Sequence, residues 1–469
     1  MKHTVFYLIP IICLSILSWL IFSLIWGKKD DTPQTTYLDL PQIEESGQLT
    51  ALTLSSSISY FIYKGEEMGY EYELIKSFAE SRGLTLNVKV AENENRLLEM
   101  LDAGEGDVIA YNISLTNENK ELFTYCGREV VNKQFLIQRA TPKDSVLQDV
   151  TDLIGREVWV LDNTKYYRRL VNLNNELGGG IIIRKIEKDT VIVEDLIEMV
   201  ARGEISYTLS DEDIARLNRT YYSNINISLE VSHPQRSSWV VNKESRQLAE
   251  ALDEWFENNQ NSPRYRAIMK RYFEMSKMPG EEPAPVLGNG KISYFDDIFK
   301  RYAPQIEWDW RLLASMAYQE SRFRLDETSW AGATGLMGLM PSTAEAFGIT
   351  PEERELPEPS VRAAVAYIRS LQRSFSKVED KNEQIKFILA SYNAGIAHVY
   401  DAQALAQKYD KNPYIWEDNV VECLKWKRLP EFYNDSVCKY GYFRGTETLN
   451  YIRHVIDRWE YYKEKVPNE

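Results

Sequence analysis

The sequence predicts a multidomain protein in which one transmembrane helix precedes an α/β domain and a mostly α-helical domain. An apolar run begins the chain, short β-rich segments then alternate with helical patterns, and almost every readable segment after residue 290 has helical spacing. A chain of 469 residues is also too long for a single compact core. The predicted domain bounds are 1–37, 38–278, 279–290 for a linker, and 291–469.

Residues 5–26 are apolar apart from three serines, and about 20 such residues are enough to span a bilayer. The run is longer than the apolar part of a usual signal peptide, and no small-residue cleavage site follows it. We therefore expect an uncleaved membrane anchor. A cleaved signal is one alternative. A lipoprotein signal acylated at Cys13 is another, although Ile12 suits it poorly. All three place the rest of the chain outside the cytoplasm.

The composition narrows the classes of function. The chain has 55 Lys and Arg residues against 70 Asp and Glu residues, a net charge of −15, which argues against nucleic-acid binding. The four cysteines form no CxxC pair and the four histidines form no HExxH motif. We expect no metal site and no cofactor.

Strands and helices alternate from about residue 49 to residue 202. Such alternation predicts an α/β domain with a largely parallel sheet. Strands are expected at 49–54, 84–90, 108–110, 157–161 and 181–186, and helices at 71–82, 95–103 and 193–202. Three prolines and three glycines in residues 278–290 then indicate a linker.

The last domain carries the candidate chemistry. Its expected helices are 312–322, 361–375, 382–392 and 447–463. On the first of them, Glu320 extends the apolar stripe formed by Leu312, Leu313, Met316 and Ala317. Burial disfavours the charged form of a carboxyl group, which suits a general acid. The plainer alternative is that Glu320 only ends a helix at the surface.

Four short motifs follow one another in this domain: Glu320-Ser321, a glycine-rich loop at 331–344, Tyr-Asn-Ala-Gly at 392–395, and Glu-Thr-Leu-Asn-Tyr at 447–451. In this order they resemble the soluble lytic transglycosylase domain, a lysozyme-like α-fold that acts on peptidoglycan. The resemblance spans nearly all of residues 291–465.

The resemblance implies roles for particular residues. Glu320 would be the sole catalytic acid/base: it protonates the oxygen between N-acetylmuramic acid (MurNAc) and N-acetylglucosamine (GlcNAc), then deprotonates the muramic O6 hydroxyl to close a 1,6-anhydro ring. Glu447 would be a structural hydrogen-bond partner. Substrate-binding roles fall to Ser321, Met337, Met340, Tyr392, Asn393 and Tyr451. Core packing is the alternative for both tyrosines. Gly338 departs from the family, which usually has Gln there.

The α/β half resembles the family-3 periplasmic solute-binding proteins through its segments 69–74, 104–110 and 203–211. That resemblance implies two lobes around a ligand cleft. Amino-acid binders of the family usually have an arginine where this chain has Asn119, with Lys120 beside it, so the usual carboxylate clamp is in doubt. Asp211 could hold an ammonium group. Tyr60, Thr116 and Thr164 are further cleft candidates, with an ordinary surface position as the alternative for each.

Together the two resemblances imply a peptidoglycan-remodelling enzyme of the bacterial cell envelope, anchored in the membrane, with its soluble domains in the periplasm. Its first domain would regulate the second and bind a cell-wall peptide or an amino acid. One rival is a hydrolase of the goose-lysozyme type, which needs a second carboxylate from Asp309, Asp326 or Glu327. Another is a solute receptor whose helical domain only binds the wall.

Two cysteines of the helical domain, Cys423 and Cys438, fall in a stretch expected to be a loop. In an oxidising compartment we expect them to form a disulfide and Cys126 to stay free.

Overall fold

The computed structural model describes residues 37–467, apart from 143–144, 187–190, 278–285 and 287–289. The predicted membrane helix, Cys13 and most of the predicted linker lie outside the described residues. Within those residues, no helix is both long and apolar enough to cross a membrane.

The first lobe is built on a five-stranded sheet in the order β4-β1-β5-β12-β6. Its strands are β1 (Gln48–Leu54), β4 (Thr85–Ala91), β5 (Val108–Ser114), β6 (Phe123–Asn132) and β12 (Gln235–Asn242). Its helices are α2 (Leu40–Ser46), α3 (Tyr70–Ser81), α4 (Glu94–Asp102), α5 (Asn117–Leu122), α9 (Arg246–Asn259) and α10 (Pro263–Phe273). A separate two-stranded hairpin consists of β2 (Phe61–Tyr63) and β3 (Glu66–Met68).

The second lobe has its own five-stranded sheet in the order β11-β7-β10-β8-β9. The strands are β7 (Gln134–Arg139), β8 (Glu157–Leu161), β9 (Ile182–Ile186), β10 (Tyr207–Asp211) and β11 (Ile225–Glu230). The 3-10 turn η1 (Val150–Leu153) and the helices α6 (Lys165–Glu176), α7 (Val193–Arg202) and α8 (Glu212–Arg219) accompany them.

The expectation of a largely parallel sheet is wrong in part. Strand β1 pairs with β4 and β5, and β8 pairs with β9 and β10, in parallel. The strands that pass between the lobes, β6, β7, β11 and β12, pair antiparallel in both sheets. A chain that crosses to the other lobe and back enters each sheet in the opposite direction, which the local alternation of strands and helices does not reveal.

The helical domain follows, and its long helices fall where the apolar periodicity predicts them. It contains α11 (Asp296–Tyr302), η2 (Ala303–Ile306), α12 (Trp310–Ser321), α13 (Pro341–Ala346), η3 (Glu353–Glu355), α14 (Pro357–Ser374), α15 (Lys381–Ala394), α16 (Ile396–Lys408), η4 (Trp416–Val420), α17 (Val421–Trp426), α18 (Pro430–Tyr433) and α19 (Thr446–Lys465). Its core includes the α12 residues Leu312, Leu313, Met316 and Ala317, all fully buried.

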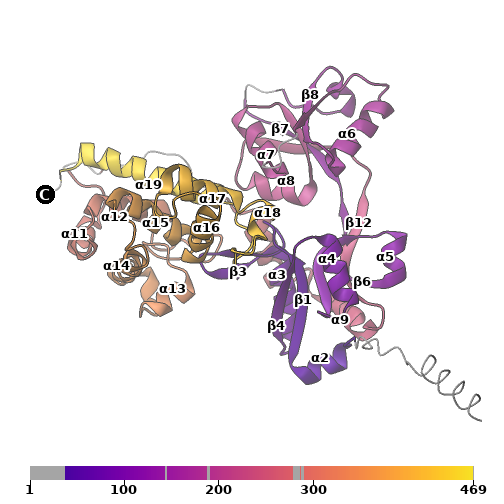
Figure 1. Ribbon diagram of the computed structural model, residues 1–469, viewed down its shortest axis with the longest axis horizontal. Coiled ribbons are helices and arrows are strands. Elements are labelled where there is room, and N and C mark those ends of the chain that lie inside the picture. The colour runs from indigo at the N-terminus through magenta and orange to yellow at the C-terminus, as the bar shows by residue number, and fades with distance from the viewer. Residues whose placement is uncertain (1–36, 143–144, 187–190, 278–285, 287–289, 468–469) are drawn as a thin grey trace, which may run out of the picture.

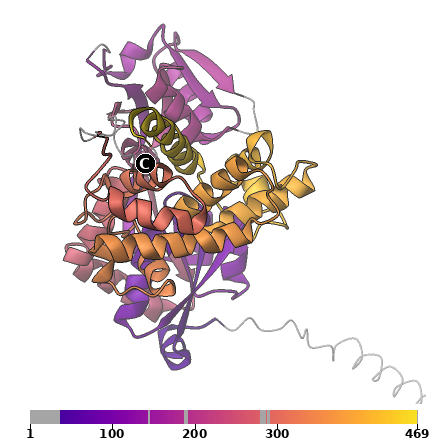
Figure 2. The same ribbon diagram turned by 90° about the vertical axis from the view of Figure 1, so that its left-hand side faces the viewer.

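Figure 1 shows the two lobes one above the other, with the helical domain beside them. In the turned view of Figure 2 the helical domain lies across the level at which the lobes meet. Apolar packing joins the bodies: Trp330, Ala331, Ala333 and Met340 of the helical domain belong to the same buried cluster as first-lobe residues Tyr63 and Tyr272. The hairpin β2–β3 lies at this junction.

The predicted disulfide is absent, since Cys126, Cys423 and Cys438 are all free thiols. The stretch that holds Cys423 and Cys438 is not an open loop, because it contains the helices α17 and α18. Cys423 is buried in the helical core and Cys438 is partly buried against it, and burial raises the pKa of each thiol to about 12. Each of the two cysteines therefore packs separately as a free thiol, and the expected disulfide does not form.

A candidate active site at the end of α12

Glu320 lies in the last turn of α12, beside a groove of about 330 Å³. The Asp309 side chain caps the start of this helix by accepting from the Arg311 amide, and Arg322 ends it in the left-handed region. The stripe of apolar residues before Glu320 is buried in the core, so the helix has a fixed position. The Glu320 side chain is only 6% exposed, and its Oε1 atom has no hydrogen-bond partner.

Residues of both domains line this groove. The helical domain contributes Glu320, Ser321, Asn393, Glu447 and Tyr451, together with the cations Arg322 and Arg324. The first domain contributes Tyr63, Lys64 and Lys277. The groove is therefore not a property of the helical domain alone.

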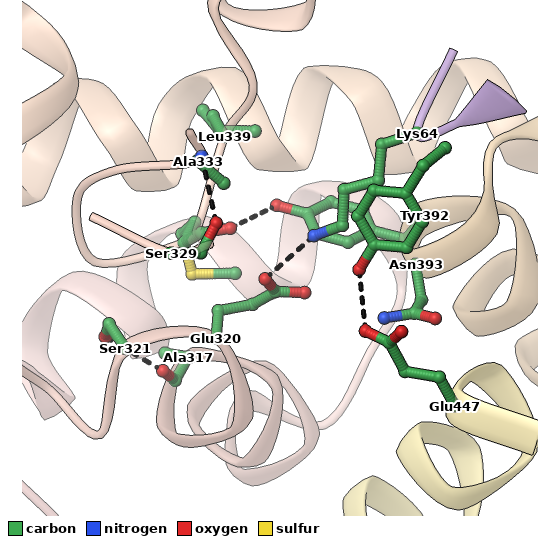
Figure 3. A network of polar contacts seen from close by, with 12 residues as sticks. Lys64, Ala317, Glu320, Ser321, Ser329, Ala333, Leu339, Tyr392, Asn393 and Glu447 are labelled. Atoms are coloured by element: carbon green, nitrogen blue, oxygen red, sulfur yellow. Dashed lines mark hydrogen bonds and ion pairs between the residues drawn. The ribbon is translucent and has the colours of Figure 1, made fainter. Parts of the chain in front are cut away.

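The nearest group to Glu320 comes from the first domain. Lys64, at the tip of the β2–β3 hairpin, places its Nζ atom 3.0 Å from Glu320 Oε2 (Figure 3). The Lys64 side chain is 9% exposed, so the ion pair is almost fully removed from water. A buried ion pair of this kind is costly to break from one side.

Main-chain contacts hold the hairpin tip in place. The Lys64 amide donates to the carbonyl of Ala394 at 3.0 Å, and the imidazole Nε2 of His398 lies 2.8 Å from the carbonyl oxygen of Ile62. Gly395 allows this approach, because a Cβ atom there would lie 3.0 Å from the amide nitrogen of Gly65. The Tyr-Asn-Ala-Gly turn thus receives a segment of the other domain.

Glu447 also pairs with the hairpin. Its Oε1 accepts a hydrogen bond from the Tyr63 hydroxyl at 2.9 Å. Burial and the Glu447 carboxylate raise the pKa of Tyr63 well above its usual value, so the phenol keeps its proton and can donate it. This agrees with the structural role expected of Glu447.

Gly338 explains how Glu320 fits beside the glycine-rich loop. Its φ is +58°, and a Cβ atom there would lie 2.3 Å from Glu320 Oε2 and 2.9 Å from Glu320 Cβ. A side chain at position 338 is therefore incompatible with this position of the carboxylate. The absence of a side chain at Gly338 leaves room for the carboxylate in its pair with Lys64.

Ser321 and Asn393, which the sequence predicts to position the sugars, both line the groove. Each also supports the local structure. The Ser321 hydroxyl bonds the carbonyls of Ala317 (3.0 Å) and Leu336 (2.9 Å), which ties α12 to the glycine-rich loop. Asn393 Oδ1 accepts from Thr448 Oγ1 at 2.6 Å. Tyr451 lines the groove as well, and burial together with the Glu320 charge raises the pKa of its phenol.

Three of the expected substrate-binding residues do not line the groove. Met337 is fully buried in the helical core, and Met340 is 4% exposed in the interdomain cluster. Tyr392 is 3% exposed and donates to the carbonyl of Met337 at 2.8 Å. The apolar pattern of the loop marks core packing here, because the same residue types serve a groove and a core equally well.

A second cavity, of about 230 Å³, lies between the two lobes of the first domain. Asp211, predicted to be a ligand-binding residue, lines it and pairs with Lys165. The other three predicted residues are absent from its lining. Thr116 and Thr164 cap the N-termini of α5 and α6, and Tyr60 donates to Glu67 at 2.7 Å. A threonine before a helix caps it as readily as it contacts a ligand.

Lys64 is the group that sequence reasoning missed. The hairpin turn Lys64-Gly65 has both φ angles positive, and Gly65 is the turn signal that the sequence contains there. That signal could have predicted the hairpin. It could not have predicted that the tip enters a groove more than 250 residues further along the chain, at Glu320.

Comparison with known proteins agrees with this architecture. Residues 297–415 match the model of the transglycosylase SLT domain, and residues 53–275 match that of the bacterial extracellular solute-binding proteins, family 3. Solved structures similar to the chain include the substrate-binding domain 2 of Lactococcus lactis GlnP in an open conformation (16% identity, 49% of this chain and 96% of that chain, TM-score 0.42). The L-cystine solute receptor of Neisseria gonorrhoeae is another such structure (16% identity, 50% of this chain and 96% of that chain, TM-score 0.42).

The fold and the groove define a class of protein in which a two-lobed solute-binding module is fused to a transglycosylase domain. A membrane-bound lytic murein transglycosylase F of Desulfosudis oleivorans is 32% identical over 90% of this chain and 92% of its own length. A membrane-bound lytic murein transglycosylase F of Pseudomonas fluorescens is 28% identical over 91% of this chain and 86% of its own length. The chain belongs to the membrane-bound lytic murein transglycosylase F family, and it is a lytic transglycosylase, a lyase that acts on peptidoglycan.

Proposed function

We propose that Glu320 is the sole acid/base with which this enzyme cleaves the β-1,4 bond between MurNAc and GlcNAc of peptidoglycan. The observation that supports this role is the position of its carboxyl group, nearly buried at the end of α12 and directed at a groove lined by polar groups. Ser321, Asn393 and Tyr451 would contact the sugars there.

The proposed reaction needs no second carboxylate. Glu320 gives its proton to the glycosidic oxygen as the bond to the muramic C1 breaks. It then takes the proton of the muramic C6 hydroxyl, whose oxygen bonds to C1 and closes the 1,6-anhydro ring. Hydrolytic glycosidases use a pair of carboxylates instead. The other acidic groups of the groove already have partners: Glu327 pairs with Arg324, and Glu447 accepts from Tyr63.

The contact between Lys64 and Glu320 supports regulation of this site by the first domain. An ammonium group 3.0 Å from the carboxylate occupies the place that a glycosidic oxygen must take. The ion pair also engages the carboxylate form of Glu320, whereas the first step requires the acid form. We therefore propose that this arrangement is inactive, and that ligand binding between the lobes withdraws the hairpin.

We further propose that residues 5–26 anchor the protein and that the domains divide at 1–37, 38–278, 279–290 and 291–469, with the soluble domains facing the periplasm. The apolar run at 5–26 supports the anchor. The description of the relatives as membrane-bound supports a place in the cell envelope.

The test of the catalytic proposal is Glu320→Gln in the full-length protein. Loss of the only proton-transfer group should lower wall cleavage by a factor of about 10² to 10⁴ or more. Glu345→Gln, an exposed change on α13, is the matched control and should leave the rate unaltered.

Mass spectrometry of the digested wall gives the second readout. Anhydro-muramic ends are expected from the parent protein, whereas reducing ends would mean that a hydrolase acts. If the Glu320→Gln protein cleaves the wall at a rate within about tenfold of the parent rate, Glu320 is not the catalytic acid/base.

A further inference from the structure

The cleft between the lobes is strongly acidic. Among its described lining residues there are five acidic groups, Glu71, Glu94, Glu194, Asp211 and Asp213, and one cation, Lys165. The formal charge of the lining is therefore −4. Lys165 pairs with Asp211, and its charge also opposes the rise in pKa that burial causes at Glu94 and Asp213.

Three of the four carboxyl groups other than Asp211 are held in place by neutral donors. Glu71, which is 4% exposed, accepts from Asn112 Nδ2 and Trp239 Nε1, each at 2.8 Å. Asp213 accepts from the Ile214 amide at 2.7 Å, and Glu194 from the Ser57 hydroxyl at 3.3 Å. They come from α3, α8 and α7, so the two lobes bring acidic groups together from both sides of the cleft.

This crowding of carboxyl groups has an energetic cost. Burial raises the pKa of Glu71 to about 7, and burial together with the neighbouring Asp211 raises the pKa of Asp213 to about 6. A cation between these groups would offset both desolvation and mutual repulsion.

Two buried polar atoms of the cleft lack partners. Gln134 Oε1 and Ser237 Oγ both line it, both residues are 6% exposed, and neither atom has a hydrogen-bond partner. A buried polar atom without a partner destabilises the empty cleft, because its hydrogen bonds to water are lost and not replaced. Both oxygens can accept, so a ligand that donates N–H hydrogen bonds would satisfy them.

Groups that could hold an anion are scarce in the same cleft. Among its described lining residues Lys165 is the only cation. Asn119, which stands where amino-acid binders have their arginine, donates to the carbonyl of Ser114 at 3.4 Å and does not line the cleft. Recognition through a carboxylate clamp is therefore disfavoured, and recognition through ammonium groups is favoured.

We propose that the cleft binds a compact organic cation through its primary ammonium groups, which pair with Glu71, Asp213 and Glu194 and donate to Gln134. The class comprises aliphatic diamines and basic amino acids, free or at the end of a short peptide. This inference rests on the proposed function only in treating the first domain as a ligand-binding module.

The test measures binding to the full-length protein in detergent by titration calorimetry, with probes matched in carbon skeleton. L-lysine is compared with L-norleucine, and 1,5-diaminopentane with 1-aminopentane, with L-glutamate as the anionic probe. At least one of the two probes that carry two ammonium groups, L-lysine and 1,5-diaminopentane, should bind about tenfold or more tightly than its matched probe and than L-glutamate. A preference for the diamine or for lysine tells whether a carboxylate is tolerated.

Variants locate the site. Asp213→Asn and Glu71→Gln should each weaken the binding by about tenfold. Glu212→Gln, on the same turn of α8 but outside the cleft lining, should not. Circular dichroism checks that each variant is folded. If Glu71→Gln fails to fold, Asp213→Asn alone carries the test.

Three results would overturn the inference: neither L-lysine nor 1,5-diaminopentane binding more tightly than its matched probe and than L-glutamate, no binding of either up to about 10 mM, or undiminished binding in the folded cleft variants. Wall cleavage measured in the same samples keeps this separate from the proposed function. An amine that binds without changing the cleavage rate would support the inference about the cleft. It would contradict only the proposal that the first domain regulates cleavage.

Discussion

Lys64 combines in one residue two features that the proposed inhibition requires. Its ammonium group lies 3.0 Å from the proposed acid/base, and its amide is bonded to the Tyr-Asn-Ala-Gly turn. The charge and the position therefore come from different parts of the residue. They can be separated by mutation, because a methionine keeps the length of the side chain and loses the charge.

Lys64→Met should raise the rate of wall cleavage about fivefold or more, because the ion pair no longer favours the inactive arrangement. Lys64→Arg retains the charge and should stay close to the parent. Lys243→Met, at an exposed position, is the control. The measurement is release of soluble fragments from purified wall. An unchanged or lower rate in a folded Lys64→Met protein would mean that the ion pair does not inhibit.

Gly338 and Gly348 form a matched pair for testing the space beside Glu320. Both have a positive φ, of +58° and +75°, but only at Gly338 would a Cβ atom meet Glu320, while Gly348 has nothing within 4 Å. Alanine at either position should cost about 1–2 kcal/mol of unfolding free energy from backbone strain. Gly338→Ala should also displace the carboxylate and change the rate of wall cleavage, whereas Gly348→Ala should not. Equal rates in the two variants would contradict this account of Gly338.

At the scale of elements, α16 supports the inserted hairpin through a buried polar network. His398 is fully buried, with Nε2 at 2.8 Å from the Ile62 carbonyl oxygen and Nδ1 at 3.0 Å from Lys427 Nζ. Lys427 also pairs with Asp401. Burial and the Lys427 charge hold the pKa of His398 well below its usual range, so the folded protein keeps this imidazole neutral.

The sign of the resulting pH dependence follows from linkage. The unfolded chain takes up a proton at His398 below about pH 6.5 and the folded protein does not, so folding loses about 1.4 kcal/mol per pH unit below that value. His398→Gln should remove this contribution and flatten the decline of stability between about pH 6.5 and 5. Urea unfolding followed by tryptophan fluorescence measures it. His233→Gln, at an exposed position, should keep the parent slope, and a parent-like slope in His398→Gln would refute the assignment.

On the scale of the whole molecule, residues 428–444 join the helical domain to both lobes. Arg428 pairs with Asp195 of the second lobe at 3.0 Å, and Arg444 Nη2 donates to Asn218 at 2.7 Å. On the first lobe, Asn434 Nδ2 donates to the Glu92 carbonyl at 3.4 Å. A movement of one lobe relative to the other must therefore strain or break contacts of this segment.

The same segment is electrostatically linked to the cleft. The Arg444 charge favours the ionised form of Glu194, which lines the cleft, and so opposes the rise in pKa that burial causes there. A cation bound beside Glu194 would compete with Arg444 for that carboxylate. This gives a physical route from the cleft to the active site, provided that the ligand binds the two arrangements with different affinity.

Arg428→Gln should weaken the inactive arrangement and raise wall cleavage without ligand, within the range of about 5- to 150-fold that such couplings typically span. Arg202→Gln breaks the pair with Glu198 and is the control, because both residues of that pair lie on α7 within the second lobe. If both variants cleave at the parent rate, the contact between Arg428 and Asp195 does not hold the enzyme inactive.

The sequence by itself determined the parts that depend on local pattern. The stripe of Leu312, Leu313, Met316 and Ala317 indicated α12 and placed Glu320 at its end, because a helix repeats its faces every 3.6 residues. The alternation of strands and helices indicated the α/β domain. The order of motifs in the last domain indicated the transglycosylase class.

Tertiary structure alone decided what depends on contacts between distant residues. The antiparallel strands between the lobes, the separate burial of Cys423 and Cys438, and the core positions of Met337 and Met340 are of this kind. So is the ion pair between Lys64 and Glu320, two residues of ordinary local pattern that meet only because an apolar interface docks the hairpin against the groove. Periodicity reports how a segment folds on itself, whereas the partner of a side chain follows from the packing of the whole chain.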